Sequence, residues 1–170
     1  MAKRTHVHLP DCWIFDRAVI KWQRKTFVIV GIMDLRSRKL LAWELLRPLK
    51  PRPTAAVLEK ALLMYGQPPA LVVGIDKVFE SPDVQATYNQ AEIQPVDIRH
   101  GKVSISIFIR SVWRSLEWEG LSWRELPDEP TFRQVVNDWI VFYNSDRPHQ
   151  ALGYAVPDEE WRTVRYKIDQ

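Results

Sequence analysis

The stretch from Thr26 to Asp34, TFVIVGIMD, constrains the fold more than any other part of the chain. It is almost continuously apolar and rich in β-branched residues, which is typical of a central strand buried on both faces. Strands are predicted before and after it, from Asp11 to Lys21 and from Lys39 to Leu46, with short polar turns between them. Three consecutive strands with short links indicate an antiparallel meander.

The rest of the chain alternates between helical and strand patterns. In chain order, we expect a proline-broken linker at 49–53, a helix capped by Thr54, a buried strand at 70–75, a helix from Ser81 to Gln90 with Pro82 at its first position, an edge strand at 93–98, an amphipathic helix at 101–119 with a weak first half, a helix at 131–143 and a short helix opening at Pro157. This order predicts an α/β fold with a mixed five-strand sheet and helices on both faces.

Length and composition indicate one soluble domain. The chain has 170 residues, of which 46% are hydrophobic and 26% charged. We expect an N-terminal extension at 1–10, one domain at 11–163 and a tail at 164–170. No apolar run reaches the roughly 18–20 residues that span a bilayer, and no signal sequence opens the chain, so a cytoplasmic protein is predicted. The net charge of +3 is compatible with a polyanion partner without demanding one.

Two aspartates are candidates for chemistry. Asp16 interrupts an apolar strand, where an acidic residue needs a partner, a metal or solvent. Asp76 follows the fourth predicted strand, which can neighbour the first in a sheet of this order. Two such carboxylates can hold Mg²⁺, and paired ions can drive phosphodiester transfer. Taken alone the pair is weak evidence, because a strand-end aspartate is more often a turn or cap residue.

Five segments carry a resemblance to a known family. They are WIFD at 13–16, IMDLRSRKLLAWEL at 32–45, TAAVLEKAL at 54–62, SVWRSLEWE at 111–119 and YNSDRPHQALGYAVPDE at 143–159. The chain resembles the catalytic core of bacterial insertion-sequence transposases of the retroviral-integrase type. The resemblance implies a ribonuclease-H-like fold, DNA as the partner, strand transfer as the reaction, and an Asp-Asp-Glu site for Mg²⁺ or Mn²⁺. Asp16 and Asp76 match the two aspartates as catalytic and metal-binding residues.

The sequence departs from that family at the site itself. The second aspartate is followed by Lys77-Val78-Phe79 in place of a glycine-containing turn. Aligning SVWRSLEWE puts Arg110 where the family has its catalytic glutamate. Arginine is always protonated and cannot ligate a metal, so we expect strand transfer to be absent or very low, and the absence of any bound metal is an open alternative to Mg²⁺ or Mn²⁺. We also expect the Arg110 guanidinium to take the place of the metal and to pair with both aspartates.

Three functions stay open from the sequence. The first is an Mg²⁺-dependent transferase in which Glu80, Asp83 or Glu117 substitutes for the missing ligand. The second is a non-catalytic DNA-binding or assembly module, with Lys102, Arg114, Arg147 and His149 as candidate DNA contacts. The third is a protein-interaction module, such as a homodimer, with Trp113, Trp118 and Trp123 as contacts. Arg147, His149 and Tyr154 have a structural alternative, in which they lock the closing loop onto the sheet.

Overall fold

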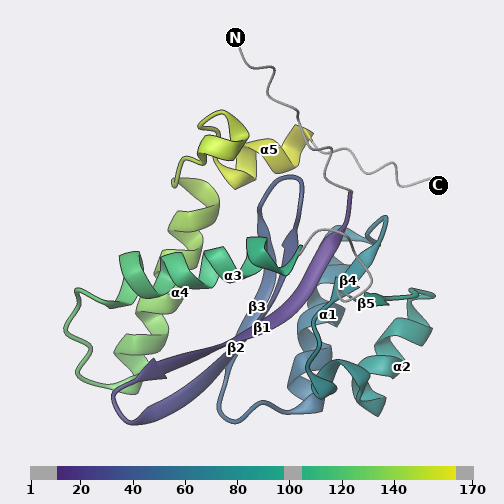
Figure 1. Cartoon of the computed structure of the whole chain (residues 1–170), viewed down its shortest axis with the longest axis horizontal. Coiled ribbons are helices and arrows are strands. Elements are labelled where there is room, and N and C mark those ends of the chain that lie inside the picture. Colours follow the sequence, from purple (N-terminus) through teal and green to yellow (C-terminus); the bar gives the residue numbers. More distant parts are fainter. Residues whose placement is uncertain (1–10, 98–104, 164–170) are drawn as a thin grey trace.

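A mixed β-sheet forms the centre of the molecule (Figure 1). The computed structural model describes residues 11–97 and 105–163. The strands lie in the order β3-β2-β1-β4-β5. Their bounds are β1 (Trp13–Trp22), β2 (Lys25–Asp34), β3 (Leu40–Leu46), β4 (Leu71–Val73) and β5 (Val96–Asp97). Strand β2 pairs antiparallel with both β1 and β3, whereas β4 pairs in parallel with β1 and β5.

The predicted α/β fold and its antiparallel meander are therefore confirmed. The fifth strand begins later than the predicted strand at 93–98: up to Asp97, where the described residues stop, β5 contributes two residues to the ladder. Pro95 immediately precedes it and has no N–H to donate, which restricts pairing before Val96. The sheet is in effect four strands with a short fifth at its edge.

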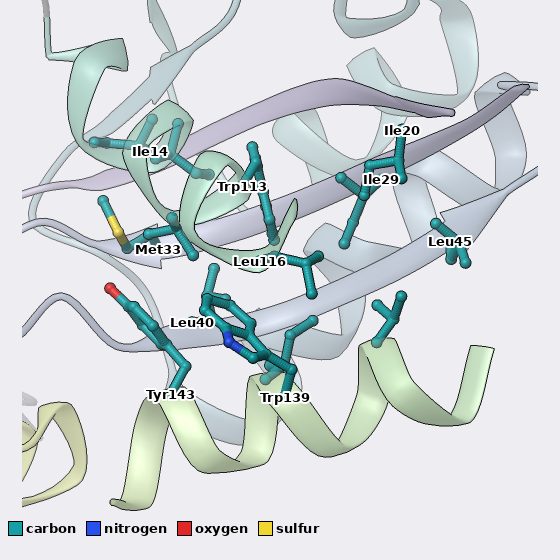
Figure 2. Close-up of a cluster of buried hydrophobic side chains, with 14 of the residues drawn as sticks. Ile14, Ile20, Ile29, Met33, Leu40, Leu45, Trp113, Leu116, Trp139 and Tyr143 are labelled. Atoms are coloured by element: carbon teal, nitrogen blue, oxygen red, sulfur yellow. The ribbon is translucent and has the colours of Figure 1, made fainter. Parts of the chain in front are cut away.

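Helices cover both faces of the sheet. They are α1 (Pro51–Tyr65), α2 (Pro82–Gln90), α3 (Ser106–Ser115), α4 (Glu129–Ser145) and α5 (Pro157–Thr163). Alternation along β1 separates two cores: Trp13 and Phe15 pack with α1 and α2, whereas Ile14 packs with α3 and α4. Figure 2 shows the second core, in which Trp113 and Trp139 come from the two helices over the strands. None of the described helices is long and apolar enough to cross a membrane.

The start of α1 corrects one prediction. The helix begins at Pro51 and is capped by Lys50, so Thr54 is not its N-cap. Thr54 lies in the first turn, where its backbone N–H and its hydroxyl both donate to the Lys50 carbonyl. The supposed linker is helical because the first-turn N–H groups have no intrahelical partner, so the proline at position 51 loses nothing there.

The predicted helix at 101–119 also has different bounds. Residues 101–104 lie outside the described part of the chain, and the α-helical turns run from Ser106 to Ser115. The chain then continues as a π-helical turn, η3 (Leu116–Leu121). Gly120 sits against the indole of Trp139, where an added Cβ would lie 3.0 Å from the ring. The wider π-helical turn thus allows the backbone at Gly120 to pack closely against α4.

Gly31 sets how closely α3 approaches the sheet. An added Cβ on Gly31 would lie 2.6 Å from Cζ2 of Trp113, a distance that real side chains do not tolerate. The Trp113 indole therefore fills the space that the missing side chain leaves on β2. Gly31 is also the direct cross-strand partner of Asp16 on β1. The same contact thus places α3 over the strand that carries Asp16.

We predict that Gly31→Ala lowers the free energy of unfolding by about 1–3 kcal/mol, because overpacking forces the indole out of its place. Urea unfolding of the wild type and the variant measures the change. Trp113→Phe removes the ring atoms that clash, so the double variant should cost less than the sum of the two single changes. Additive costs would mean that the two residues are not coupled in this way.

Candidate functional site

Asp16 lies in the middle of the molecule with only 6% of its surface exposed. It follows Phe15 on β1 and by alternation shares the face of Ile14, which is the face that α3 covers. The backbone N–H of Arg17 donates to its Oδ1 at 2.8 Å. Gly74 lies directly beside the carboxylate, since an added Cβ there would be 2.7 Å from Asp16 Cγ. A glycine at 74 is what leaves room for this buried acid.

Asp76 follows β4 on the neighbouring strand, as the predicted sheet order implied. Its Oδ1 accepts from the backbone N–H of Val78 at 3.0 Å and so caps the short 3₁₀ helix η1 (Lys77–Glu80). Its Oδ2 accepts from Arg17, at 2.8 Å from Nε and 2.5 Å from Nη2. Both carboxylate oxygens of Asp76 are thus already bonded within the protein.

Arg17 is the residue that reasoning from the sequence missed. Strand β4 ends at Val73, which pairs with Phe15, so the side of β1 beyond that point has no neighbouring strand. The Arg17 side chain uses this opening to reach Asp76. The sequence does show that a cation, Arg17, directly follows Asp16. Its ion-pair partner could not be predicted, because that partner depends on where β4 ends.

Arg110 faces the same pocket but does not form the ion pairs expected of it. It is exposed on α3 and lines a pocket of about 650 Å³ together with Asp16, Arg17, Ala18, Ile75, Asp76 and Lys77. Within residues 11–97 and 105–163 it forms no ion pair, and Asp76 pairs with Arg17. The prediction that Arg110 pairs with both aspartates is therefore wrong: Arg17 is nearer to Asp76 and is anchored on the adjoining strand.

The electrostatics of the pocket favour anions. Burial raises the pKa of the Asp16 carboxyl above its ordinary value, and the charge of Asp76 adds to this. The Arg17 N–H and the charges of Arg110 and Arg17 act in the opposite direction without cancelling the effect. Arg17, Lys77 and Arg110 together exceed the two carboxylates by one positive charge. The pocket is therefore cationic even when both aspartates are ionised.

These residues do not fit a divalent metal ion. Mg²⁺ needs several oxygen ligands in a near-octahedral arrangement. Here Asp76 is bonded to Arg17 and Val78, and Arg110 brings a positive charge to the same pocket. In the part of the chain that the structure describes, no three acidic, histidine or cysteine side chains are grouped to hold a metal. Glu117, one proposed substitute, lines a different pocket beside Trp22 and Trp118.

The closing motif places its candidate DNA contacts inside the protein's own network. Arg147 donates two hydrogen bonds to Glu119, at 2.8 Å from Nε and 2.6 Å from Nη2. The His149 ring packs edge-on against Tyr143, 4.8 Å between ring centres. This arrangement supports the structural alternative for both residues. Tyr154 takes part through its backbone, whose N–H donates to the His149 carbonyl, while its side chain is exposed.

The other candidate contacts divide by exposure. Arg114 is exposed on α3, and Lys102 lies outside the described residues. Trp113 is buried under α3 and cannot be a surface contact, which corrects that prediction. Trp118 and Trp123 are 63% and 82% exposed and remain available to a partner.

Comparisons with known proteins agree with the fold. Residues 91–157 match the integrase core domain family. The chain is similar to the HTLV-2 integrase catalytic core domain in complex with magnesium, in a trimeric form, with a TM-score of 0.68 and 13% identity over 91% of this chain and 96% of that one. It is similar to the catalytic core domain of BIV integrase, with a TM-score of 0.70 and 13% identity over 94% and 99%.

A third solved structure is a simian T-cell lymphotropic virus intasome in complex with PP2A regulatory subunit B56 gamma. Its TM-score is 0.72 at 13% identity, over 94% of this chain and 56% of that one. No curated protein sequence matches the chain. The chain thus has the fold of integrase catalytic cores, and its residues 91–157 match the integrase core domain family, in agreement with the resemblance at this level.

We predict that Asp16→Asn stabilises the fold at neutral pH. The folded protein holds the Asp16 proton to a higher pH than the unfolded chain, so stability from this group is present below the ordinary pKa of 3.8 and is lost as pH rises through the raised value. An amide avoids that loss and still accepts from the Arg17 N–H. The gain should therefore grow from about pH 4 to a plateau near neutrality.

Urea unfolding at a series of pH values measures the gain. Glu44→Gln, which removes an exposed carboxylate on β3, is the matched control. A difference between Asp16→Asn and wild type that stays flat or shrinks as the pH rises would contradict the assignment.

Proposed function

We propose that this domain is a non-catalytic integrase-type core that binds the DNA backbone at the pocket over Asp16 and Asp76. In this proposal the domain descends from an insertion-sequence transposase and has replaced metal ions with fixed cations. Arg110 and Lys77 hold a backbone phosphate, and Arg17 neutralises Asp76. The domain thus binds DNA as its partner but does not catalyse strand transfer.

The observation that carries the proposal is the Arg17–Asp76 ion pair in a pocket that also contains Arg110. In a metal-dependent site, divalent ions offset the carboxylates and attract the phosphate. Guanidinium groups do both tasks here, since arginine donors match the geometry of phosphate oxygens. Exposed Arg110 has no ion-pair partner among the described residues and is free to donate to a ligand.

The same residues argue against phosphodiester transfer. A metal ion lowers the pKa of a bound water or hydroxyl and stabilises the leaving oxygen. An arginine remains protonated and can only donate hydrogen bonds. The one strongly buried carboxylate of the pocket, Asp16, has a raised pKa and no neighbouring acid free to share an ion with it. Binding without cleavage is the outcome that this arrangement supports.

Binding of a duplex oligonucleotide as a function of salt tests the first half of the proposal. We expect binding to weaken steeply with salt, because phosphate contacts release counterions. Arg110→Gln should reduce the slope of log K against log salt by about 1. Lys60→Gln is the matched control, since it removes one exposed charge from α1 on the opposite face of the sheet. Equal slopes for both variants would contradict a contact at this pocket.

A nicking and strand-transfer assay in Mg²⁺ or Mn²⁺ tests the second half. We expect no product above the background of Asp16→Asn at any metal concentration. Metal-dependent product that Asp16→Asn abolishes would establish the competing function, a transferase with a substitute ligand. If DNA does not bind and the domain self-associates with rising concentration, the interaction module is favoured, with exposed Trp118 and Trp123 as its contacts.

A further inference from the structure

A second pocket lies on the other side of α3 from the two aspartates. It has a volume of about 240 Å³, and its polar walls are Arg38, Ser111, Ser115, Arg147 and His149. Arg38 ends the turn after β2, Ser111 and Ser115 lie on α3, and the last two residues follow α4. Arg147 and His149 were candidate DNA contacts from the sequence. The proposed function places DNA at the other pocket and does not use this one.

Arg38 is a half-buried cation held in a fixed place. Its backbone has a φ of 65°, its N–H donates to Asp34 and its carbonyl accepts from the Tyr143 hydroxyl at 3.0 Å. The guanidinium carbon lies 4.0 Å from the centre of the Phe108 ring. Nη1 is buried and has no hydrogen-bond partner among residues 11–97 and 105–163, and burial lowers the pKa of the group. The charges of Tyr143 and Asp34 act in the opposite direction on this pKa, but Nη1 itself lacks an acceptor among the described residues, and burying a cationic donor in this way is costly unless an anion joins it.

His149 supplies a second unpaired atom in the same pocket. Its Nε2 is buried and finds no hydrogen-bond partner in the part of the chain that the structure describes. Burial and the charge of Arg147 lower the pKa of the imidazole to about 4, whereas a hydrogen bond to the backbone of Tyr143 acts in the opposite direction. The ring is therefore neutral at physiological pH. With its other nitrogen bonded to the backbone, Nε2 offers a lone pair to a donor.

Arg147 contributes positive charge to the pocket, but two of its guanidinium nitrogens already donate hydrogen bonds within the protein. Its Nε and Nη2 are both bonded to Glu119, so its charge is largely balanced. The hydroxyls of Ser111 and Ser115 on α3 complete the polar wall. The unsatisfied groups of the pocket are thus one cationic donor, on Arg38, and one neutral acceptor, on His149.

We propose that the pocket of Arg38 and His149 binds a single phosphate group that still carries a P–OH, as inorganic phosphate or as the terminal phosphate of a monoester. Its anionic oxygens accept from Arg38 and the Ser115 hydroxyl, while the Ser111 hydroxyl donates to the Phe108 carbonyl, and its P–OH donates to His149 Nε2. A phosphodiester has no P–OH and would leave Nε2 unpaired. This site is therefore distinct from the DNA-backbone site that we propose at Asp16 and Asp76.

Thermal unfolding at pH 6 with added anions tests the proposal. Inorganic phosphate and methyl phosphate at about ten times Kd should each raise Tm by roughly 3–5 °C. Dimethyl phosphate and chloride at equal ionic strength should not. A larger response to methyl phosphate than to inorganic phosphate identifies a terminal monoester as the source, and the reverse identifies the free ion. No shift with either, or an equal shift with dimethyl phosphate or chloride, overturns the proposal.

Three variants locate the effect. Arg38→Gln should abolish the phosphate-dependent shift, whereas Arg36→Gln should keep it, because Arg36 is 53% exposed on the same turn and faces Asp11. Ser111→Asp places a carboxylate in the pocket and should raise Tm by itself while removing the response to phosphate. The last variant decides the question even if Arg38→Gln does not fold. A full phosphate response in Ser111→Asp would overturn the assignment.

Discussion

The contact between Trp113 and Gly31 is the constraint on which both candidate sites depend. Because β2 has no side chain at 31, the indole reaches the sheet and fixes α3 over β1 and β2. Arg110, one turn before Trp113, then borders the pocket of Asp16 and Asp76. Phe108 and Ser111 border the pocket of Arg38. A shift of α3 would alter both pockets together, so the core packing of one helix controls the charge arrangement on each side of it.

The two pockets solve the problem of buried charge in different ways. At Asp16 the protein shields a carboxylate with Arg17 and Arg110, and it bonds the neighbouring Asp76 directly. At Arg38 it stacks a cation on an aromatic ring and leaves a nitrogen unpaired. Buried ion pairs are not dependable sources of stability, but an unpaired buried charge is a clear cost. The Asp76 carboxylate of the first pocket is bonded within the chain, whereas we propose that a ligand bonds the free nitrogen of the second.

The sequence predicted the fold well where the pattern was local. The apolar run at 26–34 identified the central strand, and Pro82 marked the start of α2. The motif at the closing loop led to the integrase core, and Asp16 and Asp76 were correctly expected on neighbouring strands. The errors concerned contacts between distant segments. Arg17 pairs with Asp76 because β4 stops at Val73, and Trp113 is buried because Gly31 admits it. Neither fact is visible in the spacing of residues along one strand or helix.

The central claim is that fixed arginines occupy the place of metal ions in an integrase-type site. Crystals soaked in Mn²⁺ and measured at the manganese absorption edge test it most directly. The account predicts no anomalous peak between Asp16 and Asp76 in the wild type, and a peak once Arg17→Gln and Arg110→Glu free Asp76 and supply a third carboxylate. A peak bound by both aspartates in the wild-type protein would contradict the account.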